Sequence, residues 1–226
     1  MIARSKAVTG VMVMSVLATA ILCYGLLATG TESSNLQWGV QVGDRYLYEI
    51  HVFGHNVTRI YNPGNDSYSE TDATLLWSPM NNTRIYVTVS HLPVLPSLVD
   101  AETFADDIIN YQKTEVEFEN GSALPPEFSM CYVDLTSRTF LPTGNWTLLD
   151  ALYQDSSPDP PFMKTWYLSV LDNASFYLGY TLYGPDYADG WGGNVTLTTG
   201  VPLSSRFWAW DAIEHYQYVV ELELIQ

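Results

Sequence analysis

The chain is poor in cysteine and in positive charge. It has two cysteines, Cys23 and Cys131, and its nine Lys and Arg residues stand against 25 Asp and Glu residues. Because only Cys131 follows the N-terminal apolar stretch, a fold held by internal disulfides is excluded and stability must come from a buried core. The acidic balance also argues against binding to nucleic acid, since carboxylates repel phosphates.

Motifs of the easily recognised enzyme classes are missing as well. The sequence contains no Gly-x-Ser-x-Gly, His-Glu-x-x-His, phosphate-binding loop, Gly-x-Gly-x-x-Gly or Cys-x-x-Cys. We therefore predict no catalytic residue and expect a non-enzymatic binding or structural role. The alternative is an exported hydrolase with paired carboxylates, because such an enzyme needs only two acids that the fold brings together.

One long apolar run is present near the N-terminus. Residues 7–28 carry no charge and are preceded by Arg4 and Lys6. As a helix this run would extend about 33 Å, enough to cross the hydrocarbon core of a bilayer. We expect residues 1–30 to act as a membrane anchor with its basic flank in the cytoplasm, residues 31–39 as a linker, and residues 40–226 as one exported domain. The alternative is a signal peptide cleaved after Gly30, which would release the domain.

The exported part is rich in potential glycan acceptors. Seven asparagines stand in Asn-x-Ser/Thr triplets: Asn56, Asn65, Asn81, Asn120, Asn145, Asn173 and Asn194. We predict N-glycosylation and a location at the cell surface. Asn65, Asn81, Asn120 and Asn173 neighbour turn signals and should be exposed, whereas Asn145 should cap a helix. Only seven basic residues accompany the 25 acidic ones beyond residue 30, a net charge of −18.

Alternating apolar residues dominate this exported part. Strands are predicted at residues 46–52, 57–61, 71–77, 84–90, 114–119, 164–171, 175–183, 193–199, 206–211 and 215–224. Helical spacing predicts two short helices, at residues 98–110 and 146–153. The predicted fold is α+β and mainly antiparallel: a curved sheet, a half barrel or a sandwich with about two short helices, besides the N-terminal one.

Two groups of residues are candidates for binding. Asp186, Asp189 and Asn194 lie among glycines in residues 184–194, and loop oxygens of this kind suit weak calcium binding. Trp208 and Trp210 share one face of a strand and could line a groove for a sugar or a lipid. Each group has an ordinary alternative, because acids and asparagine also form turns and aromatic rings also fill sheet cores.

Two segments of the domain resemble other proteins. Residues 38–48, Trp-Gly-Val-Gln-Val-Gly-Asp-Arg-Tyr-Leu-Tyr, and residues 199–203, Thr-Gly-Val-Pro-Leu, are similar to phrases in exported archaeal surface proteins. The resemblance covers these two segments and carries no catalytic motif. It implies a β-rich surface protein. From the apolar run, the triplets and the aromatic residues we expect as partners the membrane through residues 7–28, covalent glycans, and a surface protein, glycan or lipid.

Overall fold

A computed structural model describes residues 34–73, 75–153, 164–212 and 216–225. Residues Asn35–Gln226 form one compact unit, distinct from Met1–Ser34. The predicted anchor or signal segment, residues 1–30, lies outside the described residues. Of the helices that the structure describes, none combines the length and the apolar character needed to cross a membrane.

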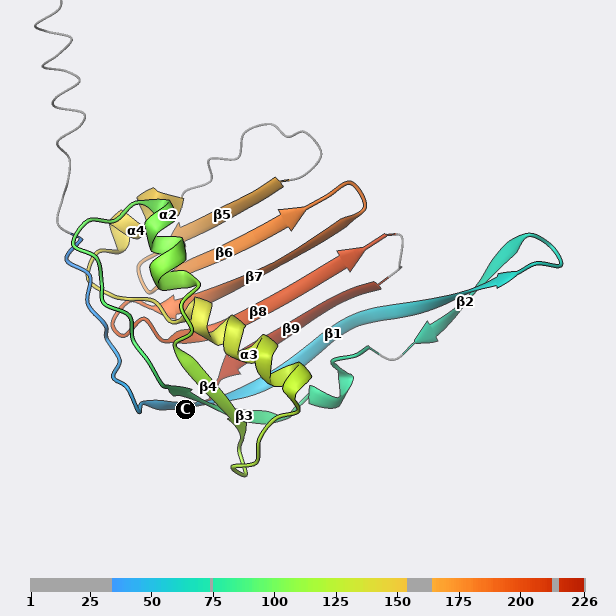
Figure 1. Ribbon diagram of the computed structural model, residues 1–226, viewed down its shortest axis with the longest axis horizontal. Coiled ribbons are helices and arrows are strands. Elements are labelled where there is room, and N and C mark those ends of the chain that lie inside the picture. The colour runs from blue at the N-terminus through green and yellow to red at the C-terminus, as the bar shows by residue number, and fades with distance from the viewer. Residues whose placement is uncertain (1–33, 74, 154–163, 213–215, 226) are drawn as a thin grey trace, which may run out of the picture. The chain divides into compact units, whose positions relative to one another are not determined.

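An open antiparallel sheet makes up most of the unit (Figure 1). Its described strands follow the order β4-β3-β1-β9-β8-β7-β6-β5, with β2 paired to β1 beside this path. They are β1 (Arg45–Asn62), β2 (Ser67–Ala73), β3 (Arg84–Val89), β4 (Thr114–Phe118), β5 (Lys164–Leu171), β6 (Ser175–Tyr183), β7 (Tyr187–Thr196), β8 (Pro202–Asp211) and β9 (Tyr216–Leu224). The prediction of a mainly antiparallel sheet is confirmed.

Strand β1 is longer than the sequence predicted. The strands predicted separately at residues 46–52 and 57–61 form one strand, which continues through Gly54 with a φ of 124° that glycine tolerates. The far half of β1 pairs with β2, from Asn56 opposite Ala73 to Asn62 opposite Ser67. This hairpin extends beyond the neighbouring strand ends (Figure 1).

Three α-helices are described where about two were predicted. They are α2 (Ala101–Phe104), which continues into the π-helical turn η2 (Ala105–Ile109), α3 (Pro126–Thr139) and α4 (Trp146–Tyr153); a short 3-10 turn, η1, spans Ser78–Met80. Helix α4 has the predicted bounds, and Asn145 caps it by accepting a hydrogen bond from the backbone N–H of Leu148 at 3.1 Å. Asp100 caps α2, which begins three residues later than predicted, by accepting a hydrogen bond from the backbone N–H of Thr103 at 2.8 Å. Helix α3 was not predicted.

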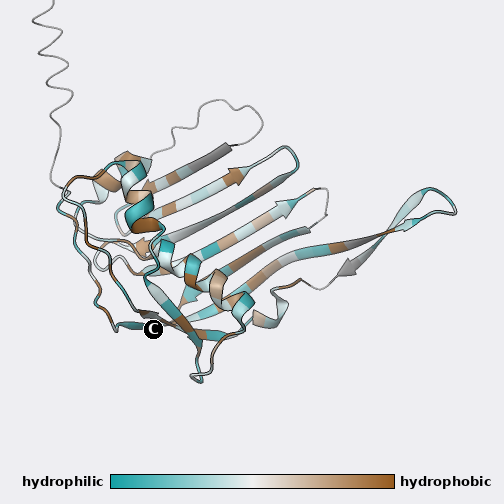
Figure 2. Ribbon diagram, in the orientation of Figure 1, coloured by the Kyte–Doolittle hydropathy of each residue, from teal (hydrophilic) through white to brown (hydrophobic). Residues whose placement is uncertain are grey.

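Helix α3 crosses one face of the sheet, which we call the helix face (Figures 1 and 2). It contacts β4, β7 and β8. Near its end, the hydroxyl groups of Thr139 and Ser205 lie 2.7 Å apart, and the Thr139 methyl group contacts Gly193 of β7. A side chain at position 193 would separate the helix from the sheet, so Gly193 sets how closely α3 can pack.

Residues 35–39 belong to the folded unit instead of forming a linker. The backbone N–H of Gln37 donates to the carbonyl of Thr143 at 2.9 Å. The indole of Trp38 donates to the carbonyl of Pro93 at 2.9 Å. These contacts attach the segment to the loop before α2 and to the loop between α3 and α4.

Candidate functional site

A groove lies between α3 and strands β6 to β9. It has a volume of about 360 Å³, within the range of small-molecule sites. Most of its wall is aromatic, contributed by Trp77, Tyr180, Trp191, Phe207, Tyr216 and Tyr218. Helix α3 closes one side with Cys131, Asp134, Leu135 and Arg138. We call this space the aromatic groove.

The register of the strands brings the rings together. Trp191 of β7 lies opposite Tyr180 of β6 on one side and opposite Phe207 of β8 on the other. The Tyr180 and Trp191 rings are stacked, with centroids 6.4 Å apart and an angle of 16° between their planes. The Phe207 and Trp77 rings meet edge to face, with their centroids 4.8 Å apart. Side chains opposite each other in a sheet share a face, so the Tyr180, Trp191 and Phe207 rings all lie on the helix face.

A small residue leaves the floor of the aromatic groove open. Ala209 of β8 pairs with Asp189 on one side and with Tyr218 on the other. Its methyl group separates the Tyr180–Trp191 stack from a second pair of stacked rings, Tyr216 and Tyr218, whose centroids are 5.9 Å apart. A larger side chain at position 209 would therefore fill the space between the two ring pairs.

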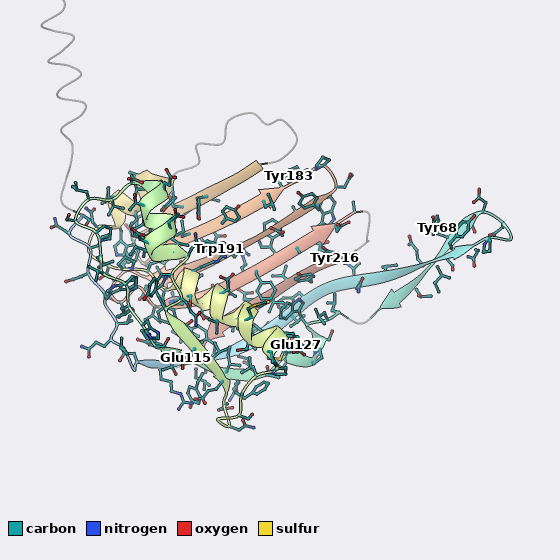
Figure 3. All side chains as sticks on the ribbon, viewed as in Figure 1. Tyr68, Glu115, Glu127, Tyr183, Trp191 and Tyr216 are labelled. Atoms are coloured by element: carbon teal, nitrogen blue, oxygen red, sulfur yellow. The ribbon has the colours of Figure 1, made fainter. Side chains whose placement is uncertain are left out.

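Two of the three charged side chains of the groove form an ion pair on α3. Arg138 donates through Nε to Asp134 Oδ1 at 3.0 Å, in the i, i+4 spacing of a helix. The guanidinium of Arg138 also lies 5.5 Å from the centre of the Trp191 ring. Figure 3 shows Trp191 beside α3, in agreement with this contact.

The third charged side chain, Asp189, is different. In the part of the chain that the structure describes, its carboxylate makes no ion pair and no hydrogen bond. Partial burial raises its pKa above the ordinary value for aspartate. The groove therefore contains one carboxylate that the protein leaves without a counter-charge.

Trp191 offers an unused hydrogen-bond donor. Its side chain is 7% exposed, and its indole N–H has no partner among the described residues. Such a buried donor costs free energy unless something accepts from it. Trp38 and Trp146, by contrast, donate to backbone carbonyls. Because this N–H is itself buried, Trp191 contributes its ring, and not its donor, to the wall of the aromatic groove.

Cys131 is half-buried at the wall of the aromatic groove. Burial and the nearby charge of Asp134 raise the pKa of its thiol. The raised pKa disfavours the thiolate, which is the nucleophilic form. Cys131 thus behaves as a packing residue.

The structure does not bring the three predicted calcium ligands together. Residues 187–192, expected as loop, belong to strand β7, because three glycines of the strand make room for the side chains of Trp208, Tyr177 and Thr139. Asp189 lies on the helix face and Asn194 on the opposite, outer face, while Asp186 precedes the strand. Within the described ranges, no three His, Cys, Asp or Glu side chains gather as a metal site would require. Calcium binding stays a prediction without this geometric support.

Trp208 and Trp210 do share one face, as predicted, but it is the outer face. Trp208 lies across Gly190, where a Cβ would come within 2.8 Å of the indole. Both tryptophans line a shallow hollow of about 270 Å³ with Arg206 and Gln217. Their side chains therefore point away from α3 and from the ring pairs of the aromatic groove.

The predicted glycan acceptors occupy different settings. Asn65, Asn81, Asn120 and Asn173 are exposed, as expected from their turn signals. In two of these sites the serine hydroxyl of the triplet donates to the asparagine carbonyl, Ser67 to Asn65 at 2.8 Å and Ser122 to Asn120 at 2.7 Å. The remaining three, Asn56, Asn145 and Asn194, are half-buried.

The residues that build the aromatic groove were mostly missed from the sequence. Phe128, Cys131, Tyr132 and Leu135 have helical spacing, and Pro126 with Glu127 is a typical helix start. These signals could have revealed α3. Nothing in the local sequence could have shown that α3 lies over Trp191 and Phe207. Comparison with known protein families, with curated proteins and with solved structures finds no match for this chain.

Proposed function

We propose that the protein is an exported binding protein that holds a small ligand with an apolar body in the aromatic groove. In this proposal the open sheet curves as a half barrel around its helix face, and α3 covers part of it. The ligand slides between the two ring pairs and rests on Ala209. Aromatic walls supply most of the affinity through burial of apolar surface, and few polar groups fix orientation.

The observation that carries this proposal is the open, ring-lined space above Ala209. A core built only for stability would fill this space with side chains. Here the space is kept, and aromatic residues line it. A ligand with an apolar body would occupy it.

The setting of this binding protein follows from its sequence. Residues 7–28 would anchor it in the cytoplasmic membrane, and the exported domain would carry N-glycans on the exposed sites Asn65, Asn81, Asn120 and Asn173. The net charge of −18 keeps such a domain soluble and away from anionic surfaces. Cleavage after Gly30 would give the same binding protein in secreted form.

Native mass spectrometry of the full chain, purified from the organism that makes it, tests the proposal. Wild-type protein should carry a small molecule in addition to its glycans. Ala209→Leu should lose this molecule, because the larger side chain fills the floor of the aromatic groove. Ala212→Leu is the matched control, since Ala212 is exposed and does not line the groove, and it should keep the molecule. Wild-type protein without any bound molecule, or equal retention by Ala209→Leu, would overturn the proposal.

A hydrolase is the second candidate, and one observation favours it. Asp134 and Asp189 line the same groove, Asp134 paired with Arg138 and Asp189 with a raised pKa. Two carboxyl groups in unlike environments are the arrangement of an acid and a base in glycoside hydrolysis. If this candidate is right, the full chain should hydrolyse 4-methylumbelliferyl glycosides, and Asp134→Asn and Asp189→Asn should each abolish turnover. Asp186→Asn should leave it unchanged.

A further inference from the structure

The charges of the aromatic groove do not cancel. Asp134 and Arg138 neutralise each other at 3.0 Å, and no other cation lines the groove among the described residues. Asp189 therefore adds one uncompensated negative charge. A ligand that carries one positive charge would balance the site, whereas a neutral ligand would leave a partly desolvated carboxylate beneath it.

The rings around Asp189 suit the same charge. Along β7, Trp191 stands two residues from Asp189 on the helix face, and Tyr180 stacks on Trp191. Across Ala209 stands Tyr218, stacked on Tyr216. Aromatic faces attract alkylammonium ions, and they do so more strongly where water is partly excluded. Arg138 lies 5.5 Å from the centre of the Trp191 ring, and its charge is balanced by Asp134.

We propose that the ligand is a small organic cation whose alkylammonium group sits beside Asp189, between the Tyr180–Trp191 and Tyr216–Tyr218 ring pairs. This inference rests on the proposed binding function and specifies its ligand class. Asp189 supplies the counter-charge, and the four rings contact the methyl or methylene groups. The apolar remainder lies over Ala209.

The charge of the whole domain supports this class of ligand. With seven basic and 25 acidic residues beyond residue 30, the exported part attracts small cations and repels small anions. Such attraction is screened over about 8 Å at physiological salt, so it raises the rate of encounter more than the affinity. The selectivity itself comes from Asp189 and the rings.

Choline and its neutral isostere 3,3-dimethylbutan-1-ol are the probes that test the inference. The two molecules have the same shape, and only choline is charged. Isothermal titration calorimetry with the full chain in a nonionic detergent should show choline binding about tenfold more tightly. In Asp189→Asn this preference should fall to about twofold or less. Asp186→Asn removes the same charge from the turn before β7 and should keep the tenfold preference.

Each outcome decides one point. Equal binding of choline and the alcohol to wild-type protein would overturn the cationic ligand and leave the proposed binding function intact, because the groove would then hold neutral molecules. An unchanged preference for choline in Asp189→Asn would also overturn the inference, since another group would then recognise the positive charge of choline. Stronger binding of Nα-acetyl-lysine methylamide than of choline would show that the groove receives a peptide side chain instead of a small molecule. Lack of binding by any of the three probes would contradict the inference, while the mass spectrometry of wild-type and Ala209→Leu protein judges the proposed function separately.

Discussion

Replacing Tyr132 with phenylalanine should make the protein more stable, which few core substitutions do. The Tyr132 side chain is fully buried, and its hydroxyl has no hydrogen-bond partner in the described part of the chain. Its ring lies 5.9 Å from the Trp77 ring and 6.3 Å from the Phe207 ring. Phenylalanine keeps these ring contacts and leaves almost no cavity. Removing an unpaired buried hydroxyl should therefore raise the free energy of unfolding by ~1–3 kcal/mol.

Tyr48 provides the matched comparison. It is also fully buried, but its hydroxyl donates to the carbonyl of Pro202 at 2.8 Å. Tyr48→Phe should lower the free energy of unfolding by ~1–2 kcal/mol, because the carbonyl loses its donor. Urea unfolding followed by tryptophan fluorescence, at equal m-values, measures both changes. Equal destabilisation by the two substitutions would refute the reasoning, since it would mean that the Tyr132 hydroxyl is paired.

Three further changes probe other parts of the unit. Burial and the Arg138 guanidinium lower the pKa of Lys113 from 10.5 to about 7. Between these two pH values the unfolded chain keeps the proton on Lys113 and the native state does not, so the free energy of unfolding should rise with pH across this window, by at most ~1.4 kcal/mol per pH unit. Urea unfolding of Lys113→Met should lack this rise. Gly200 has a φ of 70° and lies against the Leu141 carbonyl, so Gly200→Ala should lower the free energy of unfolding by ~2 kcal/mol or more. Gly43 has a φ of 99° and no neighbour near its Cβ position, so the loss of stability in Gly43→Ala should come from backbone strain alone. Asn145→Ala should cost ~1 kcal/mol by removing the cap of α4, and Asn145→Asp should restore it while abolishing the glycan triplet, both read by thermal melting.

The sequence predicted correctly those strands and helices whose conformation is set mainly by residues close by in the sequence. Strands β5 and β6 have the predicted bounds, because regular alternation leads into a turn in which Asp172 accepts from the backbone N–H groups of Ala174 and Ser175. Helix α4 was found from its apolar spacing and its asparagine cap. In these segments the burial pattern, the turn and the cap agree.

The misses occur where distant residues decide the local structure. Glycines in β7 indicate a loop when read alone, but in the sheet they make room for Tyr177, Trp208 and Thr139. Helix α3 contains Thr, Val, Tyr and Cys residues that favour strands, and it is held by packing on β7 and β8. Because the aromatic groove joins this helix to four strands, its residues could not be grouped from spacing in the sequence.

The indole N–H resonances of the seven tryptophans offer the most direct test of the aromatic groove. A titration of the ¹⁵N-labelled full chain with benzyl alcohol, a neutral aromatic probe, should shift the Trp191 signal, because the Trp191 ring lines the groove and an aromatic ring packed against it changes the shielding of its N–H. The Trp38 and Trp146 signals should stay in place, since their N–H groups are bonded to the carbonyls of Pro93 and Leu197. A Trp191 signal that does not move while those of Trp208 or Trp210 do would place binding on the outer face and contradict the account.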